Sequence, residues 1–248
     1  MDAMILAAGL GTRLRPLTDH TPKALIEIGG VSILEQIARR LAAAGVDRII
    51  VNAHRHPDQV EAAADRLARE LGVDVKVSLE AEAPLETGGG LAHAESFFRK
   101  GGSFFLYNGD IVTDIDLAGL LAAHQATGAL ATLAVGRRET TRRLLFDRKG
   151  LVGWENAATG RRERCREPVE EIEAWPFAGI HVISPEIFGL ITEKGAFSIL
   201  DLYLRLSAEG HRILPHDVSQ VLWLEIGDPE RLARARTVLT GGEDFRSG

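Results

Sequence analysis

Short apolar runs alternate along the chain with longer stretches in which apolar residues recur every three or four positions. The short runs predict strands, and they lie at 3–7, 48–53, 73–79, 103–107, 130–135, 177–183, 211–215 and 222–226. The longer stretches predict helices, at 33–44, 57–71, 91–99, 116–127, 198–209 and from Asp228-Pro229 to about 239, with a short helix after Ser184-Pro185. This alternation predicts an α/β fold: a single-domain, Rossmann-like, mostly parallel mixed sheet with helices on both faces.

Residues 137–175 interrupt this pattern. The stretch is polar and carries only short alternating pieces, at 144–147 and 151–155. We interpret it as hairpins laid over the sheet rather than as another strand–helix unit. The predicted organisation is therefore one domain over residues 1–240 with a hairpin insertion, followed by a frayed tail at 241–248.

Composition narrows the classes of partner. The chain has 248 residues and a formal net charge of −6, and it contains no dense run of Lys and Arg, which argues against a nucleic-acid partner. No apolar run reaches the roughly 18 residues that a membrane span needs, and the N-terminus does not resemble a signal peptide. The single cysteine, Cys165, allows no internal disulfide. We therefore expect a cytoplasmic protein with no membrane partner.

The loop after the first apolar run concentrates glycine and positive charge. In "LAAGLGTRLRP" Gly9 and Gly11 are followed by Arg13, and Lys23 comes soon after. The dinucleotide fingerprint would need a third glycine where Leu14 stands, and no Gly-Lys-Ser/Thr of a P-loop occurs. A plain strand–helix turn with solvated arginines stays open. A cationic spot on an acidic chain, in a loop that lets backbone N–H groups approach oxygens, favours a polyphosphate clamp.

Two later stretches carry further candidate chemistry. "YNGD" ends the run at 103–107, which places Asp110 at the carboxyl edge of the predicted sheet, where it could bind a hard cation or simply form a turn. "PLETGGGL" contains three successive glycines, Gly88 to Gly90, more than a helix start with Thr87 as its cap requires. They would let the backbone approach a flat ligand.

Taken together, these motifs resemble those of one enzyme family. "LAAGLGTRLRPLTDHTPKALIEIGGVSILE" is similar to the signature of the sugar-1-phosphate nucleotidyltransferases, and "PLETGGGL", "FLYNGDIVTD", "FAGIHVISPEIF" and "WLEIGDPERLARA" follow in the expected order. The chain looks most like the short branch typified by N-acetylmuramate 1-phosphate uridylyltransferase. The resemblance implies the nucleotide-diphospho-sugar transferase fold. It also implies transfer of a nucleoside monophosphate from an NTP to a sugar 1-phosphate, with Mg²⁺ as cofactor and pyrophosphate as second product.

The resemblance also implies roles for individual residues. Arg13 would bind the β- and γ-phosphates, and Lys23 the α-phosphate and the incoming phosphate; these two are the expected catalytic residues. Asp110 and Glu225 would bind Mg²⁺. The implied nucleotide-binding residues are Leu6, Ala7, Ala8, Gly9, Gly11, Thr12, Arg13, Glu86, Thr87, Gly88 and Asn108. The implied sugar-binding residues are Asn108, Arg143 and Gly179.

The chain departs from the family pattern at two places. Glu225 stands where the family carries an Asp, so its carboxylate lies one methylene farther from the backbone. The family's lysine for the sugar phosphate is also missing before the strand at 177–183. Either Lys23 and the metal suffice, or an arginine takes its place; the candidates are Arg143, Arg161, Arg162, Arg164 and Arg166.

Substrates and assembly are less constrained. The "PLETGGG" branch favours UTP. The alternatives are GTP with mannose- or heptose-type phosphates, CTP with a non-sugar phosphate, and a non-catalytic regulator that binds nucleotide sugars. A monomer and a homodimer are both compatible with the sequence.

Overall fold

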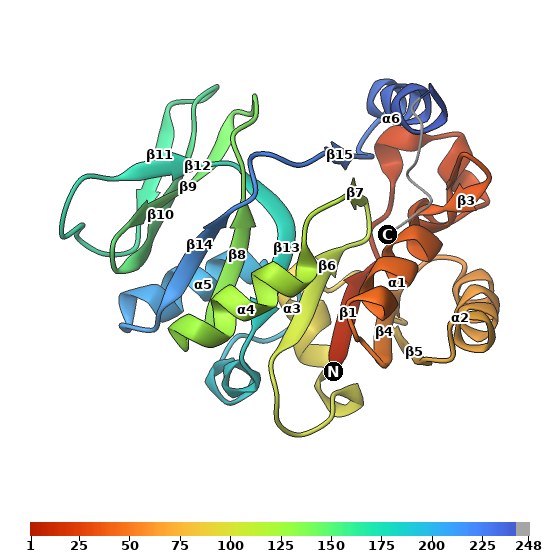
Figure 1. Cartoon of the computed structure of the whole chain (residues 1–248), viewed down its shortest axis with the longest axis horizontal. Helices are drawn as coiled ribbons and strands as arrows, with labels where there is room; N and C mark the ends of the chain where they lie inside the picture. Colours follow the sequence, from red (N-terminus) through yellow and green to blue (C-terminus); the bar gives the residue numbers. More distant parts are fainter. Residues whose placement is uncertain (242–248) are drawn as a thin grey trace.

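A seven-stranded mixed sheet forms the centre of the protein, whose computed structural model describes residues 1–241 (Figure 1). The strands lie in the order β14-β8-β13-β6-β1-β4-β5. Their bounds are Asp2–Leu6 (β1), Arg48–Ala53 (β4), Asp74–Leu79 (β5), Phe104–Asn108 (β6), Ala131–Val135 (β8), Phe177–Ile183 (β13) and Ile213–Asp217 (β14). All neighbours are parallel except β13, which runs antiparallel to β6 and β8. The predicted α/β architecture is confirmed.

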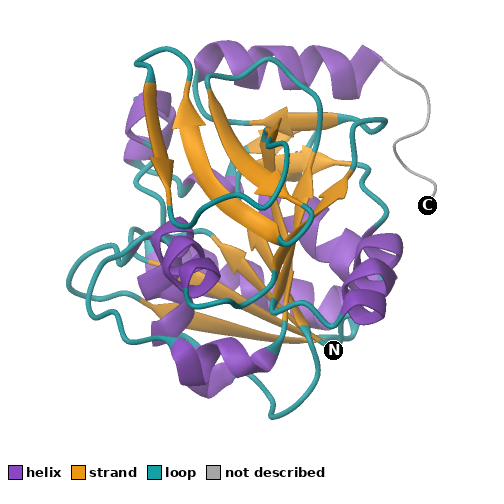
Figure 2. Ribbon diagram, turned by 90° about the vertical axis from the view of Figure 1, so that its left-hand side faces the viewer, coloured by secondary structure: helices purple, strands orange, loops and turns teal. Residues whose placement is uncertain are grey.

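Helices cover both faces of this sheet, as Figure 2 shows. The helices whose buried side chains belong to one core cluster are α1 (Ile33–Ala43), α2 (Pro57–Leu71), α4 (Leu117–Thr127) and α6 (Pro229–Gly241). Those that contribute to the cluster on the other face are α3 (Glu86–His93) and α5 (Ile199–Ala208). Of the helices in residues 1–241, none has the length and apolar composition needed to cross a membrane.

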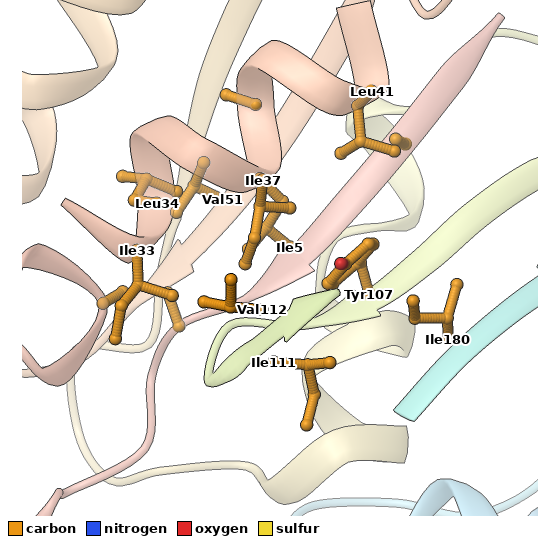
Figure 3. Packing of buried hydrophobic residues seen from close by; sticks show 14 of the residues in the cluster. Ile5, Ile33, Leu34, Ile37, Leu41, Val51, Tyr107, Ile111, Val112 and Ile180 are labelled. Carbon is orange, nitrogen blue, oxygen red and sulfur yellow. The ribbon is translucent and has the colours of Figure 1, made fainter. Parts of the chain in front are cut away.

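Strand alternation explains why there are two clusters. Ile5 of β1 and Tyr107 of β6 point to the side of α1, where they pack with Ile37 (Figure 3). Met4 and Leu106, one residue earlier on the same strands, belong to the opposite cluster. Because successive side chains of a strand point to opposite faces, continuous apolar runs such as these are typical of a sheet buried on both sides.

Residues 142–175 form a separate antiparallel sheet beside the main one. Its strands, in the order β11-β10-β9-β12, are Arg161–Arg164 (β11), Gly150–Asn156 (β10), Arg142–Asp147 (β9) and Glu173–Trp175 (β12). β10 lies against α5 and β14 at the sheet edge. At the end of β9, beside the turn into β10, the fully buried Asp147 carboxylate accepts hydrogen bonds from Arg166 at 2.5 and 2.8 Å. The alternation at 144–147 and 151–155 therefore indicated antiparallel strands correctly.

Short 3₁₀ turns and two-stranded pairs lie outside the seven-stranded sheet. The first loop contains three 3₁₀ turns, Thr12–Leu14 (η1), Leu17–Asp19 (η2) and Lys23–Leu25 (η3), and the pair β2 (Glu27–Ile28) and β3 (Val31–Ser32). β7 (Ile111–Thr113) pairs with β15 (Trp223–Glu225). In Figure 1 this pair lies between the four-stranded sheet and α6.

Several predicted boundaries need correction. The predicted helix 91–99 begins earlier, as α3 at Glu86, and its second half is a 3₁₀ turn, η4 (Glu95–Phe97). The short helix after Ser184 is also 3₁₀, η5 (Pro185–Leu190). Ser198 and Asp228 cap α5 and α6, since Ser198 accepts from the N–H of Leu200 at 3.2 Å and Asp228 from that of Arg231 at 2.9 Å. Apart from residue 241, the last of α6, the predicted tail lies outside the described residues.

Candidate active site

A cavity of about 220 Å³ opens at the carboxyl ends of β1, β4, β5 and β6. This edge is where open α/β sheets bind ligands. The residues that line it are Leu6, Ala7, Ala8, Gly9, Lys23, Ala24, Asn52, Glu80, Pro84, Glu86, Thr87, Asn108, Gly109 and Asp110. Most of the residues predicted to bind nucleotide or metal are therefore brought together in one place. We refer to this cavity as the nucleotide cavity, after the ligand that the sequence motifs predict for it.

Glu86 is the conformational outlier of this cavity. Its backbone has φ +60°, which side chains with a Cβ rarely adopt. Such strain costs of order 1–3 kcal/mol and is found most often at functional sites. The position of Glu86 on the cavity wall is consistent with its predicted role toward the nucleotide.

The predicted residues Gly11, Thr12, Arg13 and Gly88 do not line this cavity. Gly11 has φ +61°, and a Cβ there would meet the Thr18 methyl group at 2.8 Å, so it is needed to close the turn. Arg13 lies in the middle of η1, and its side chain points toward the segment around Gly227. One of its terminal nitrogens lies 3.3 Å from where a Cβ on Gly227 would be. Arg13 is thus beside the segment that carries Glu225.

The three successive glycines are needed for close packing, whereas the sequence indicated that they let the backbone approach a flat ligand. They lie inside α3, and all are buried. A Cβ on Gly88 would meet the Phe197 ring at 2.3 Å, and one on Gly89 the Gly195 carbonyl oxygen at 2.4 Å. Thr87 is not a cap, because its hydroxyl oxygen accepts a hydrogen bond from the Ile199 N–H at 2.8 Å. The glycines let α3 approach the chain before α5, and a contact of Gly88 with a ligand stays a prediction.

Asn52 and Glu80 form a buried polar link that the sequence reasoning missed. The Asn52 side-chain oxygen accepts from the N–H groups of Ala7 and Ala8 at 2.6 and 3.2 Å. Its amide nitrogen donates to Glu80 at 2.7 Å, and the other oxygen of Glu80 accepts from the Leu85 N–H at 2.7 Å. Both side chains are 2% exposed. The only available signal was a polar residue at the end of each of two apolar runs.

Lys23 and Asp110 both line the nucleotide cavity and form an ion pair there. The Lys23 ammonium donates to the Asp110 carboxylate at 2.6 Å. The lysine is positioned by η3, which begins after Pro22, and Asp110 follows β6 directly. Residues 87 positions apart in the sequence thus place opposite charges at one point, where a phosphate could bind the cation.

Asp110 and Glu225 reach this region from paired strands. Glu225 lies opposite Ile111 in the β7–β15 pair, and the Ile226 N–H donates to the Asp110 carbonyl at 2.8 Å. The Glu225 carboxylate, however, is bound by Arg231 at 2.5 Å. The longer side chain of Glu225 is therefore directed toward α6 and not toward Lys23.

Asp110 and Glu225 offer the kind of ligands that a magnesium ion could use together with oxygens from the substrates, and their binding of Mg²⁺ stays a prediction. Within residues 1–241, no three His, Cys, Asp or Glu side chains gather into a complete set of metal ligands. Mg²⁺ commonly takes one or two carboxylates, with phosphate oxygens and waters completing its octahedron. Asp110 and Glu225 are both partly exposed, and each binds a side-chain cation that such an ion could displace.

A second cleft, of about 800 Å³, is lined by Glu225 of this pair. Its walls come from the four-stranded sheet, α5 and β15; they are formed by Arg138, Thr140, Arg142, Arg143, Leu144, Trp154, Asn156, Thr159, Arg161, Glu163, Phe177, Leu200, Asp201 and Glu225. We call it the acceptor cleft. It contains the predicted sugar-binding residue Arg143, which forms an ion pair with Glu155 at 2.7 Å.

Gly179 lies against Asn108 and Ile111. Its φ is +79°, and a Cβ there would come within 2.9 Å of the Asn108 amide nitrogen. Asn108 lines the nucleotide cavity, so the two predicted sugar-binding residues contact each other at its edge. Gly179 is needed here because any side chain would displace Asn108.

With this geometry in place, comparison with known proteins decides the family. The family model described as "Nucleotidyl transferase" matches residues 2–241. The chain belongs to this family. It is therefore a nucleotidyltransferase, as the motifs of the first loop and of "YNGD" indicated.

Individual relatives of this nucleotidyltransferase agree in sequence and fold. The chain is 34% identical to the N-acetylmuramate alpha-1-phosphate uridylyltransferase of Caulobacter vibrioides, over 92% of each chain. It is 32% identical to the mannose-1-phosphate guanyltransferase of Kluyveromyces lactis, where 93% of this chain spans 62% of that protein. Among solved structures, the inositol-1-phosphate CTP transferase of T. maritima shares the fold, with a TM-score of 0.71 at 18% identity, over 95% of this chain and 96% of that one.

Proposed function

We propose that this nucleotidyltransferase transfers a nucleoside monophosphate from an NTP to a sugar 1-phosphate and releases pyrophosphate. One observation carries the proposal: Asp110 lines the nucleotide cavity, Glu225 lines the acceptor cleft, and the two residues belong to paired segments. An in-line displacement needs the attacking oxygen and the leaving pyrophosphate on opposite sides of the reacting phosphorus. Two separate spaces beside the same paired segments, one for each substrate, suit this requirement.

The reaction exchanges one bond for another. An oxygen of the acceptor phosphate forms a bond to the α-phosphorus while the bond from the α-phosphorus to the β-phosphate oxygen breaks, and the electron pair leaves with pyrophosphate. The nucleophile is already an anion, so no general base is required. The barrier is dominated by repulsion between anions, which fixed cations and correct positioning reduce.

The residues would act as follows. Lys23, which lines the nucleotide cavity, binds the α-phosphate and the incoming phosphate. The N–H groups of the loop after Ala8 bind the triphosphate, and Asn52 anchors the start of this loop through Ala7 and Ala8. Arg13, beside Gly227, binds the phosphates that leave. Asp110 and Glu225 would hold Mg²⁺, which when bound neutralises phosphate charge and polarises the α-phosphorus.

UTP is the proposed nucleotide. The "PLETGGG" stretch supports it, and so does a uridylyltransferase relative that is matched over almost its whole length. The guanyltransferase relatives keep GTP with a mannose-type phosphate as the second candidate. A cytoplasmic location and the choice between monomer and homodimer stay predictions.

A matrix of substrates tests the proposal. The purified protein is incubated with Mg²⁺, one of the four NTPs, and N-acetylmuramate, N-acetylglucosamine, glucose or mannose 1-phosphate, while pyrophosphate release is followed. Inositol 1-phosphate and phosphocholine extend the panel to non-sugar acceptors. We expect the highest rate with UTP and a sugar phosphate. Nucleotide binding without pyrophosphate release from any pair would instead support a non-catalytic regulator.

A further inference from the structure

The acceptor cleft contains four arginines, and they are not equivalent. Arg143 pairs with Glu155 at 2.7 Å, and Arg161 pairs with Glu163 at 3.2 Å. In the described part of the chain, Arg138 and Arg142 form no ion pair. The cleft therefore holds two cations that no carboxylate of the described residues binds directly in an ion pair.

The other arginines considered for the missing lysine can be set aside. Arg166 is bound to the buried Asp147 at the far end of the four-stranded sheet. Arg162 reaches Glu155 at 3.7 Å, and Arg164 is exposed; neither lines the cleft. This leaves Arg138 and Arg142 as the candidates for an anion in the cleft.

Arg138 differs from Arg142 in being fixed. Its guanidinium carbon lies 3.2 Å from the centre of the Trp223 ring, and one terminal nitrogen donates to the Phe177 carbonyl oxygen. The Trp223 indole N–H donates to the next carbonyl, that of Ala178, at 2.7 Å. Stacked and anchored together, the two side chains hold the guanidinium at the start of β13, two residues before Gly179. Trp223 itself lies two residues before Glu225 in β15.

The guanidinium of Arg138 has donors that remain unused. Two of its nitrogens, Nε and Nη1, are buried and have no hydrogen-bond partner. Burial lowers the pKa of this guanidinium to about 10, while the nearby Glu225 carboxylate opposes the shift. A buried, incompletely bonded cation is costly to the folded protein, and a planar guanidinium fits phosphate oxygens well.

We propose that Arg138 is the residue that binds the phosphate of the acceptor, in place of the lysine that this chain lacks. The proposal rests on the proposed function and assigns a further substrate-binding residue to the same site. The stack on Trp223 orients the guanidinium before the acceptor arrives, which reduces the entropy lost on binding. Since Trp223 and Glu225 both belong to β15, the same stack places the acceptor phosphate near the Glu225 carboxylate.

The test compares two substitutions that remove the same charge from the same cleft. Arg138→Met and Arg142→Met are assayed for initial rates, with the sugar 1-phosphate and the NTP varied in turn. We expect Arg138→Met to raise the KM for the sugar 1-phosphate about 10- to 100-fold, the loss typical of a charged hydrogen bond. The KM for the NTP should stay within about twofold. Arg142→Met should change the sugar-phosphate KM less than about threefold, and Arg138→Lys should recover part of the loss.

Several results would overturn the proposal. Equal effects of the two methionine variants would mean that only the total charge of the cleft matters. A parallel rise in both KM values of Arg138→Met, or an altered far-ultraviolet circular dichroism spectrum, would assign Arg138 a structural role. If the wild type releases no pyrophosphate with any pair, the proposed function fails. The arginine is then tested by calorimetric titration with N-acetylglucosamine 1-phosphate, whose binding should weaken in Arg138→Met and not in Arg142→Met.

Discussion

The substitution Glu80→Gln gives a sharp test of how the nucleotide cavity is built. The N–H groups of Ala7 and Ala8 both point at the Asn52 side-chain oxygen, so the Asn52 amide nitrogen must face Glu80. The Leu85 N–H faces the other Glu80 oxygen. Both oxygens of the carboxylate therefore meet donors. A glutamine has one oxygen and one NH₂ group, so it leaves a donor facing a donor in either orientation.

The magnitude follows from this count. One buried donor left unsatisfied costs about 1–3 kcal/mol, and the site is closed to water because Glu80 and Asn52 are each 2% exposed. The free energy of unfolding should fall by this amount. The loop amides after β1 lose their anchor as well, so the KM for the NTP should rise about tenfold, corresponding to about 1.4 kcal/mol. The KM for the acceptor should change little, because Glu80 does not line the acceptor cleft.

Urea denaturation followed by circular dichroism and initial-rate kinetics measure the two effects. Glu82→Gln is the matched control: Glu82 is exposed and forms no hydrogen bond in residues 1–241. The Glu82 variant should leave the free energy of unfolding within about 0.5 kcal/mol of the wild-type value, and the KM for the NTP within about twofold. If Glu80→Gln were as stable as the Glu82 variant, the reasoning about donors and acceptors would be refuted.

Three further outcomes are expected. Asp110→Asn should lower kcat about 100-fold or more in the pyrophosphate assay, since it removes a carboxylate at the reacting centre; a rate near that of the wild type would exclude Asp110 from catalysis. Gly88→Ala should destabilise the protein by about 2 kcal/mol in urea, because its Cβ would meet the Phe197 ring at 2.3 Å; Phe197→Leu in the same chain should recover part of this loss. Hydrogen bonds from the Arg166 guanidinium hold the pKa of Asp147 well below its usual range, so the stability from this pair is complete above the ordinary Asp pKa of about 3.9 and is lost as pH falls toward the lowered value. Asp147→Asn should cost about 3 kcal/mol at pH 7 and weaken the acid dependence of unfolding, and an unchanged dependence would count against the pair.

The order of elements was predictable because it depends on local patterns. Continuous apolar runs followed by glycine or a helix cap identify buried parallel strands and the helices between them, as at β1 and at α5 after Ser198. The same logic placed Asp110 at the carboxyl edge of the sheet, because it follows β6 directly. Its contact with Lys23, across 87 positions, was not predicted from the sequence.

What sequence could not supply were contacts made between distant segments. The three glycines of α3 are explained only by residues that approach the helix from other parts of the chain: Phe197 at Gly88, Gly195 at Gly89, and Glu80 with Asn52 at Gly90. Asn52 and Glu80 lie 28 positions apart, and neither belongs to a motif. The binding of Glu225 by Arg231 likewise depends on how α6 folds back beside β15. Each of these contacts is a property of packing, which periodicity does not describe.

Phosphorus NMR on the complete reaction tests the central claim most directly, because it reports where each phosphate goes. The wild-type protein is mixed with UTP, Mg²⁺ and N-acetylmuramate 1-phosphate or the preferred acceptor. We expect the sugar-phosphate signal to be replaced by that of a nucleotide diphosphate sugar, with one pyrophosphate formed for each nucleotide sugar. Formation of UDP and orthophosphate, or of UMP and pyrophosphate with the sugar phosphate left intact, would contradict it.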